Sequence, residues 1–206
     1  WMYEVHLPGL EKWIMPEIDE KMTRELKALR SYDHLLDLLD EVAERHDHAL
    51  ALQEITDDGL TRVTYRYWRD VSHFAAEVLR EAGVKEGDRV VLGGRNRPGW
   101  GMAYFAILRA GAVVVPVDPA LEGPQLWNIV RSSAAVACIW DETIEEKGAP
   151  HVRERAPSTP IFDLASLTSP TEGEARLARY RFQGAKPSGE DVASILYTSG
   201  TTGEPK

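Results

Sequence analysis

The sequence predicts an α/β protein with a mostly parallel sheet flanked by helices and a small β-hairpin beside it. Three observations lead to this fold class. Strand-like and helix-like segments alternate between Arg89 and Leu164, an order that implies parallel strands joined by right-handed crossovers. Residues 112–117 form a continuous apolar run, which is typical of a strand covered on both faces. The dipeptide Asp58-Gly59 separates two extended runs and is a strong hairpin signal.

Residues 1–48 are expected to be a helical lead-in. Apolar residues recur at helical spacing over residues 13–30, and Pro16 suits a first helical turn. Ser31 or Asp33 could cap a second helix. The residues of that helix expected to face a core are Leu35, Leu36, Leu38, Leu39 and Val42.

The hairpin strands should span residues 49–55 and 60–65. Thr64 is placed to cap a helix that reaches Ala82, and Gly83 is placed to end it. The apolar residues expected on one face of this helix are Trp68, Val71, Ala75, Val78 and Leu79.

The alternating region predicts four strands, at residues 89–92, 112–117, 134–140 and 160–164. Pro98 should open a helix that stops at Gly111, and residues 122–133 should form another helix. Residues 141–190 are rich in charge, Pro, Ser and Gly, so we expect a surface excursion with little helix apart from residues 174–180.

Length and composition exclude several classes of protein. A chain of 206 residues allows one domain or two small ones, and no internal repeat or domain linker is evident. The net charge of −9 argues against binding to nucleic acid or an anionic membrane. No apolar run approaches the ~18 residues that a transmembrane helix needs. The first residues lack the profile of a signal peptide, so a cytoplasmic location is expected.

No metal site is expected. Cys138 is the only cysteine, which excludes a disulfide framework and a cysteine metal site. His46-Asp47-His48 is expected to be a solvated helix end, because no further His or Cys cluster accompanies it.

The last stretch of the chain carries the clearest functional signal. Residues 192–197 form an apolar run, predicted to be a buried strand, and hydroxyl residues and glycines follow it directly. The glycines allow successive backbone N–H groups to turn toward one point, while hydroxyls and a lysine add donors and positive charge, a combination that suits a polyphosphate. The predicted phosphate-binding residues are Thr198, Ser199, Gly200, Thr201, Thr202, Gly203 and Lys206. A Ser/Thr/Gly surface loop that binds nothing is the alternative.

Two other nucleotide-binding patterns fit poorly. Pro205 and Lys206 follow the second glycine where a P-loop needs Lys and then Ser or Thr. A dinucleotide-binding unit would need G-x-G-x-x-G over residues 93–99, with Asp118 for the ribose, and this stretch departs from that pattern.

Residues 197–206, Tyr-Thr-Ser-Gly-Thr-Thr-Gly-Glu-Pro-Lys, resemble the phosphate-binding signature of the adenylate-forming (AMP-binding) superfamily. This superfamily includes acyl-CoA synthetases, luciferases and the adenylation domains of peptide synthetases. Residues 63–68 and 108–119 resemble two of its upstream core motifs, with Tyr67 where the first has glutamate. Residues 96–100, Asn-Arg-Pro-Gly-Trp, resemble the Asn-Arg-Pro-Glu-Trp of long-chain acyl-CoA synthetases, with Gly99 in place of glutamate.

The resemblance implies that residues 1–206 are a partial N-terminal AMP-binding domain, the N-terminal subdomain of the acyl-CoA synthetase-like fold. It implies an ATP-dependent ligase that joins a carboxylic acid, here a fatty acid, to CoA through an acyl-adenylate, with ATP, Mg²⁺ and CoA as cofactors. The loop from Thr198 to Gly203 would hold the β- and γ-phosphates, and Lys206 would help to neutralise them. The family's catalytic lysine, its magnesium and adenine motifs and most of its acyl pocket would follow Lys206. No catalytic residue is therefore expected in the 206 residues, and the chain by itself should be inactive.

Two alternatives remain open at this point. One is an acyl-AMP ligase or a peptide-synthetase adenylation domain, which passes the acyl group to a carrier protein. The other, from a different class, is a non-catalytic module that binds phosphate or a partner protein.

Overall fold

The computed structural model describes residues 32–56, 59–182, 184–185 and 187–197. The chain divides into two units, Trp1–Tyr32 and Asp33–Lys206, and the description below concerns the second. The helix predicted from Pro16 lies outside the described residues, as does most of the predicted lead-in over residues 1–48.

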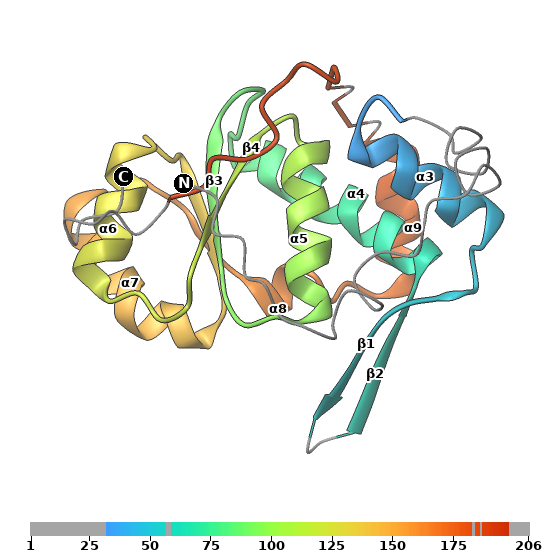
Figure 1. The fold of residues 1–206 in the computed structure, drawn as a ribbon, viewed down its shortest axis with the longest axis horizontal. Coiled ribbons are helices and arrows are strands. Elements are labelled where there is room, and N and C mark those ends of the chain that lie inside the picture. Colours follow the sequence, from blue (N-terminus) through green and yellow to red (C-terminus); the bar gives the residue numbers. More distant parts are fainter. Residues whose placement is uncertain (1–31, 57–58, 183, 186, 198–206) are drawn as a thin grey trace, which may run out of the picture. The chain divides into compact units, whose positions relative to one another are not determined.

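Helices and strands alternate along most of the described chain (Figure 1). In chain order the elements are α3 (Leu35–Arg45), β1 (Leu50–Thr56), β2 (Gly59–Thr64), α4 (Tyr65–Glu81), β3 (Arg89–Gly93), α5 (Pro98–Arg109), β4 (Val113–Val117), α6 (Gly123–Ser132), β5 (Ala137–Trp140), α7 (Glu142–Arg155), β6 (Ile161–Asp163), α8 (Leu164–Leu167) and α9 (Glu172–Arg181).

The central sheet has four strands in the order β4-β3-β5-β6. Every neighbouring pair is parallel, which confirms the predicted parallel sheet. The third predicted strand begins later than expected, at Ala137 rather than Ala134. Ala134 has a φ of 50° and belongs to the turn that ends α6, so the chain is not extended there.

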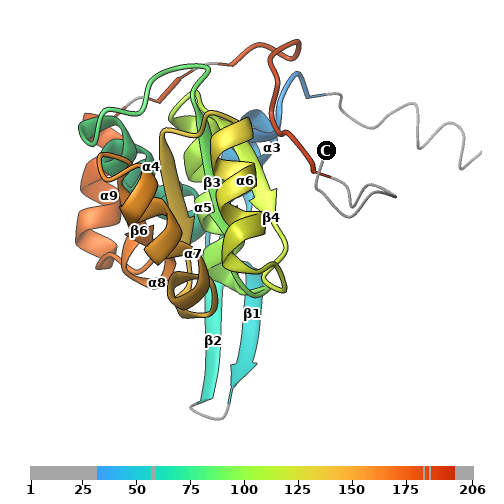
Figure 2. The same ribbon diagram turned by 90° about the vertical axis from the view of Figure 1, so that its left-hand side faces the viewer.

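Helices cover both faces of this sheet, as the views in Figures 1 and 2 show. Along β3, Val90 and Leu92 point into a core shared with α4 and α5. Val91, between them, points into a second core shared with α6 and α7. This alternation follows from the two-residue period of a strand, and it explains why the strands are apolar throughout.

The predicted hairpin is confirmed. Strands β1 and β2 pair antiparallel, with Ile55 opposite Leu60 and an irregularity near Leu50. Thr64 then caps α4, because its hydroxyl accepts a hydrogen bond of 3.2 Å from the Tyr67 N–H. Gly83 has a φ of 97° and follows the end of this helix, as predicted.

Helix α3 differs from its prediction in its cap and in its buried face. The cap is His34, whose ring nitrogen accepts a bond of 3.3 Å from the Asp37 N–H, so Asp33 does not have this role. Ser31, the other predicted cap, lies outside the described residues. Leu36, Leu39 and Ala43 are buried, whereas Leu35 and Leu38 are 43% and 38% exposed. Residues three and four positions apart share one face of a helix, so Leu36, Leu39 and Ala43 face the core. Leu35 and Leu38 each lie one position before a buried leucine and point away from that face.

Residues 141–190 contain more helix than predicted. The expectation that they form a surface excursion with little helix was wrong, because α7, α8 and α9 lie in this stretch. Helix α7 packs against the sheet through Ile144, Ala149 and Val152. Gly148 lets Trp140 lie close, because a Cβ built there would be 3.1 Å from its ring. Glycine and proline were therefore misread as loop signals, since packing against the sheet outweighs their low helix propensity. Helix α9 confirms the helix predicted near residues 174–180.

Candidate functional site at the carboxyl edge of the sheet

All the predicted phosphate-binding residues, from Thr198 to Lys206, lie outside the described residues. What the structure describes is the segment that leads to them, residues 192–197. This segment lies alongside β4, with Ser194 forming a parallel bridge to Val114. The backbone bonds run from the Val114 N–H to Ala193 and from the Ile195 N–H to Val114, each 2.9 Å long.

The segment is not the buried strand that was predicted. A single bridge joins it to β4, and Val192 and Leu196 are 62% and 71% exposed. Strand β4 is one of the two edge strands of the described sheet, so the segment has a neighbouring strand on one side only among the described residues. The apolar residues of the segment predicted burial. Burial requires that both faces of the segment be covered, and the described residues leave the Val192 and Leu196 side chains exposed.

The segment begins beside the first residues of β4 and runs parallel to that strand. Because the bridge is parallel, the segment runs in the direction of β4, and the Tyr197 hydroxyl lies 2.8 Å from that of Ser132, at the end of α6 and close to where β3 begins. After β3 the chain forms β4 on one side of β3 and then crosses over to form β5 on the other side of β3. In open parallel sheets, ligands bind outside the carboxyl ends of strands, at such a switch point.

Asp141 fills the switch point between β3 and β5. Its carboxylate accepts bonds of 2.8 Å from the Arg95 N–H and 3.0 Å from the Thr143 N–H. Burial acts to raise the pKa of Asp141, but hydrogen bonds from Thr143, Arg95 and Ile144 outweigh it and hold the pKa below its usual value. The Asp141 carboxylate thus accepts the N–H groups at this point of the sheet that an anionic ligand would otherwise bind.

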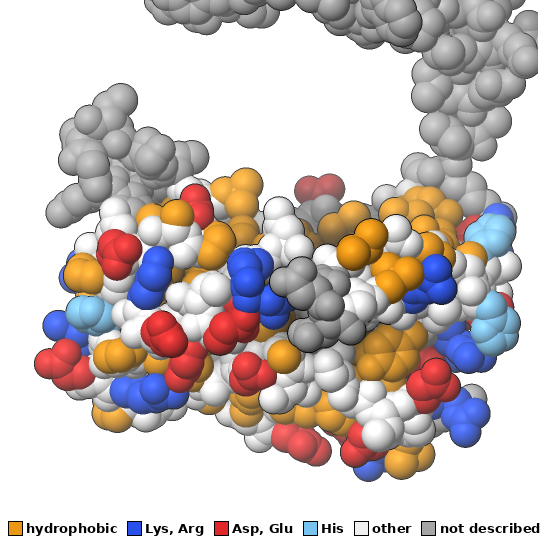
Figure 3. Space-filling model, turned by 90° about the horizontal axis from the view of Figure 1, so that it is seen from below, with side chains coloured by type: hydrophobic (Ala, Val, Ile, Leu, Met, Phe, Trp, Pro, Cys, Tyr) orange, Lys and Arg blue, Asp and Glu red, His pale blue; other side chains and the backbone are white. Residues whose placement is uncertain are grey.

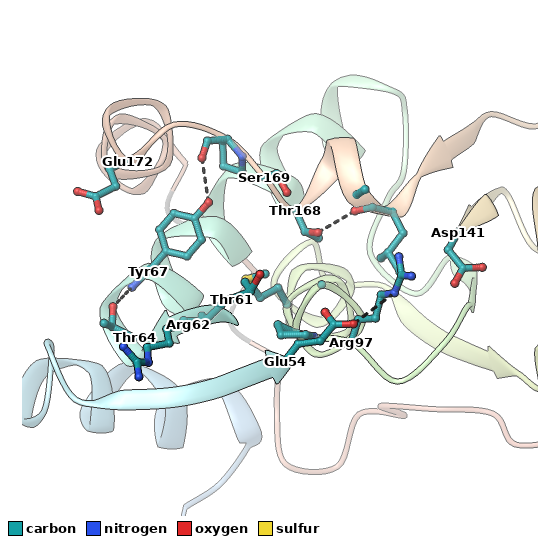
Figure 4. A pocket seen from close by; sticks show the side chains of 17 residues that line it. Glu54, Thr61, Arg62, Thr64, Tyr67, Arg97, Asp141, Thr168, Ser169 and Glu172 are labelled. Atoms are coloured by element: carbon teal, nitrogen blue, oxygen red, sulfur yellow. Dashed lines mark hydrogen bonds and ion pairs between the residues drawn. The ribbon is translucent and has the colours of Figure 1, made fainter. Parts of the chain in front are cut away.

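A pocket of about 560 Å³ opens beside Asp141 (Figure 4). It lies between the hairpin, the start of α5 and the segment from α8 to α9, and its floor includes the buried side chains of Val63, Met102 and Leu164. This volume falls within the range of small-molecule sites.

The polar groups of the pocket come from several elements. The Arg97 guanidinium lies 3.7 Å from the Glu54 carboxylate and 3.3 Å from that of Glu142. The Tyr67 hydroxyl donates a bond of 2.9 Å to the Pro170 carbonyl, and Thr168 donates one of 2.7 Å to Leu164. Burial, and then the charge of Glu172, raise the pKa of Tyr67. The pocket can therefore receive a molecule with both apolar and polar parts.

Sequence reasoning did not select Arg97 as a site residue. It lies in the short loop between Gly93, where β3 ends, and Pro98, which opens α5, so its position beyond the carboxyl end of a parallel strand was a usable signal.

A second cavity of about 550 Å³ opens where β4 begins, at the opposite edge. Carboxylates of Asp33, Glu86 and Asp191 are among the groups that line it. Their negative charge disfavours a polyphosphate there.

The described part of the chain offers neither a metal-binding cluster nor a membrane-spanning helix. Across the described residues, no group of three or more His, Cys, Asp or Glu side chains could hold a metal ion. His46 and His48 are exposed just after α3, as predicted for a helix end. None of the described helices combines the length and the apolar character that crossing a bilayer requires.

Comparison with known families gives one match over most of the chain. The family model described as AMP-binding enzyme matches residues 39–206. A long-chain-fatty-acid–CoA ligase, FadD15 of Mycobacterium tuberculosis, is 32% identical over 182 residues, which are 79% of this chain and 29% of that protein. The nonribosomal peptide synthetase verP of Clonostachys rogersoniana is 33% identical over 172 residues, which are 84% of this chain and 8% of that protein.

Solved structures share the fold. The inhibitor-bound N-terminal domain of FACL13 from Mycobacterium tuberculosis superposes with a TM-score of 0.70 at 27% identity, over 85% of this chain and 43% of that one. VinN superposes with a TM-score of 0.69 at 23% identity, over 86% of this chain and 45% of that one, and shows the fold alone. The chain thus spans less than a third of these two curated relatives and less than half of these two solved chains.

Proposed function

This chain belongs to the AMP-binding enzyme family, and on that premise we propose that the protein is an ATP-dependent ligase acting through an acyl-adenylate. A carboxylate oxygen attacks the α-phosphorus of ATP, and the bond to pyrophosphate breaks. The thiol of CoA then attacks the acyl carbon, loses its proton, and AMP leaves.

The observation that carries this proposal is the sequence from Thr198 to Lys206, which follows a segment that runs parallel to β4. The amides and hydroxyls between Thr198 and Gly203 would bind the β- and γ-phosphates, and Lys206 would add a positive charge. These groups would stabilise the pyrophosphate as it leaves, and positioned donors supply most of the catalysis in such transfers.

Magnesium enters this proposal only as the counter-ion of ATP. Among the described residues there is no group of acidic side chains suited to hold it, so no step is assigned to a magnesium ion bound by them. Since ATP and CoA are abundant in the cytoplasm, we expect the protein to act there.

For the acid, we propose a fatty acid with CoA as the acceptor. The likeness to a long-chain-fatty-acid–CoA ligase supports this choice, as does the stretch Asn96-Arg97-Pro98-Gly99-Trp100. A second candidate is adenylation for a carrier protein, supported by a similar degree of identity to a nonribosomal peptide synthetase.

The first prediction concerns the exchange of radiolabelled pyrophosphate into ATP by the protein from the complete reading frame. Short, medium, long-chain and aromatic acids would be supplied in turn, with the 206-residue chain assayed in parallel. We expect exchange that depends on a long-chain acid, and none by the 206-residue chain, since it matches only 29% of the long-chain-fatty-acid–CoA ligase FadD15.

Two matched variants test the lysine. Lys206→Met should reduce exchange by about one to two orders of magnitude. Lys85→Met, in an exposed turn distant in sequence from Lys206, should leave exchange unchanged. CoA and a carrier protein with a thiol arm would then be compared as acceptors. Absence of exchange with every acid would reject the ligase and favour a non-catalytic phosphate-binding or interaction module.

A further inference from the structure

Two side-chain hydrogen bonds hold the segment that precedes the phosphate loop. The Tyr104 hydroxyl on α5 lies 2.6 Å from the Ser194 hydroxyl. The Ser132 hydroxyl, at the end of α6, lies 2.8 Å from the hydroxyl of Tyr197. The two bonds therefore tie the middle and the end of residues 192–197 to helices on opposite faces of the sheet.

These bonds matter because the other attachments of the segment are few. Its backbone makes a single bridge to β4, and Val192 and Leu196 contribute little burial. Ile195 and Tyr197 are only partly buried against the core shared with α6 and α7. A segment so weakly paired depends on its side-chain bonds for a fixed position.

Further contacts fix the orientation of the Tyr104 ring and of the Ser132 hydroxyl. The Tyr104 ring stacks on Trp100, with centroids 5.7 Å apart and planes at 27°, so its hydroxyl points in a defined direction. The Ser132 hydroxyl is also 3.4 Å from the Ile129 carbonyl. Ser132 can donate to that carbonyl while it accepts from Tyr197, which satisfies both hydroxyl protons.

We propose that Tyr104 and Ser132 are positioning residues for the phosphate loop. Tyr197 comes directly before Thr198, so a hydrogen bond to its hydroxyl restrains the residue from which the predicted phosphate loop starts. A displaced loop would present its donors at the wrong distances, and polyphosphate binding would weaken. This inference rests on the proposed function and deepens it.

The test uses the protein from the complete reading frame, with variants Ser132→Ala, Tyr197→Phe and the double variant. Each single change should raise the KM for ATP in pyrophosphate exchange about three- to tenfold, the range expected from one hydrogen bond. The double variant should be no worse than either single variant, because one bond is lost in each case. The KM for the acid and the melting temperature should stay unchanged, and Ser132→Thr should restore the KM for ATP. Tyr104→Phe and Ser194→Ala form a second cycle with the same expectation.

Ser133→Ala is the matched control. The Ser133 hydroxyl donates to the same Ile129 carbonyl, at 2.7 Å, and no bond joins it to Tyr197 in the described structure. Its removal should leave the KM for ATP unchanged. If Ser132→Ala and Tyr197→Phe leave that KM unchanged too, or raise it additively, the positioning inference is wrong and the ligase proposal stands. If the unmodified protein shows no acid-dependent exchange, the proposed function fails and the inference fails with it.

Discussion

His73, in the middle of α4, is buried and makes its contacts with the end of α9. Its Nδ1 lies 3.0 Å from the Phe182 carbonyl, so the neutral ring donates there. Burial and then the nearby Arg109 lower the pKa of His73 to about 4, against the opposing effects of the Phe182 carbonyl and Asp40, with Arg179 a further lowering charge. Between pH 6.5 and about 4, the His73 ring is therefore neutral in the native protein, whereas the same ring in an unfolded chain binds a proton.

Stability should consequently fall as the pH decreases from 6.5, the pKa expected in the unfolded chain, toward 4. The loss attributable to His73 reaches roughly 3 kcal/mol at the lower end of this window. His73→Asn keeps a donor for Phe182 but cannot titrate, so urea denaturation between pH 7.5 and 5 should show a flatter profile for this variant. The exposed His48→Asn serves as control and should keep the profile of the unmodified protein. Equal slopes for all three proteins would contradict this account.

At the scale of elements, close packing of β3, β4 and α7 depends on the absence of a side chain at Gly93. A Cβ built there would lie 2.6 Å from the Val117 side chain and would also meet the end of Ile144. Valine is branched at Cβ and has little freedom to move within a strand. The carboxyl end of β3 therefore tolerates only glycine without displacing a neighbouring element.

Gly93→Ala should lower the free energy of unfolding by about 1–3 kcal/mol, as overpacking of a core does. Gly173→Ala is the matched control, because that glycine is exposed in the first turn of α9 and a Cβ there would meet nothing closer than 4.0 Å. It should stabilise the protein by up to about 1 kcal/mol. Chemical denaturation of both variants measures the difference, and equal effects would show that the predicted overpacking does not occur.

Across the molecule, the carboxyl edge of the sheet is where distant parts of the chain meet. Asp141 joins the loop after β3 to the first turn of α7, and the pocket beside it receives residues from the hairpin and from the segment before α9. On the face shown in Figure 3, acidic and basic side chains are interspersed, so the net charge of −9 is not gathered into one patch there.

Asp141→Asn should lower stability by about 1–2 kcal/mol at pH 7, because the amide loses the charge-assisted bonds and weakens the cap of α7. Since the pKa of Asp141 is held below its usual value, its contribution is present above about pH 4 and is lost as the pH falls through the lowered pKa. The two proteins should therefore converge in acid. Glu142→Gln, at an exposed neighbouring carboxylate, should cost less than about 0.5 kcal/mol, since exposed ion pairs contribute little. Denaturation of all three proteins at pH 7 and pH 3 provides the measurement, and a constant difference between Asp141→Asn and the unmodified protein would contradict the assignment.

The sequence by itself determined the fold class, the hairpin and the family. Alternating apolar segments, the capping Thr64 and Asp58-Gly59 act locally, so their outcome could be predicted without a structure. The stretch from Tyr197 to Lys206 likewise identifies the family from residue types and spacing alone. Short-range preference and a contiguous motif are properties that a linear sequence displays directly.

Tertiary structure alone decided the features that depend on contact between distant residues. Helix α7 forms in spite of Gly148 and Pro150 because the sheet covers its apolar face. The pocket at Arg97 forms because the hairpin, α5 and α8 meet there, and no local pattern records that meeting. The bonds from Tyr104 to Ser194 and from Ser132 to Tyr197 join residues 90 and 65 positions apart. Such pairs are set by the strand order and by helix packing, since partners far apart in the chain are brought together only when the whole sheet has assembled.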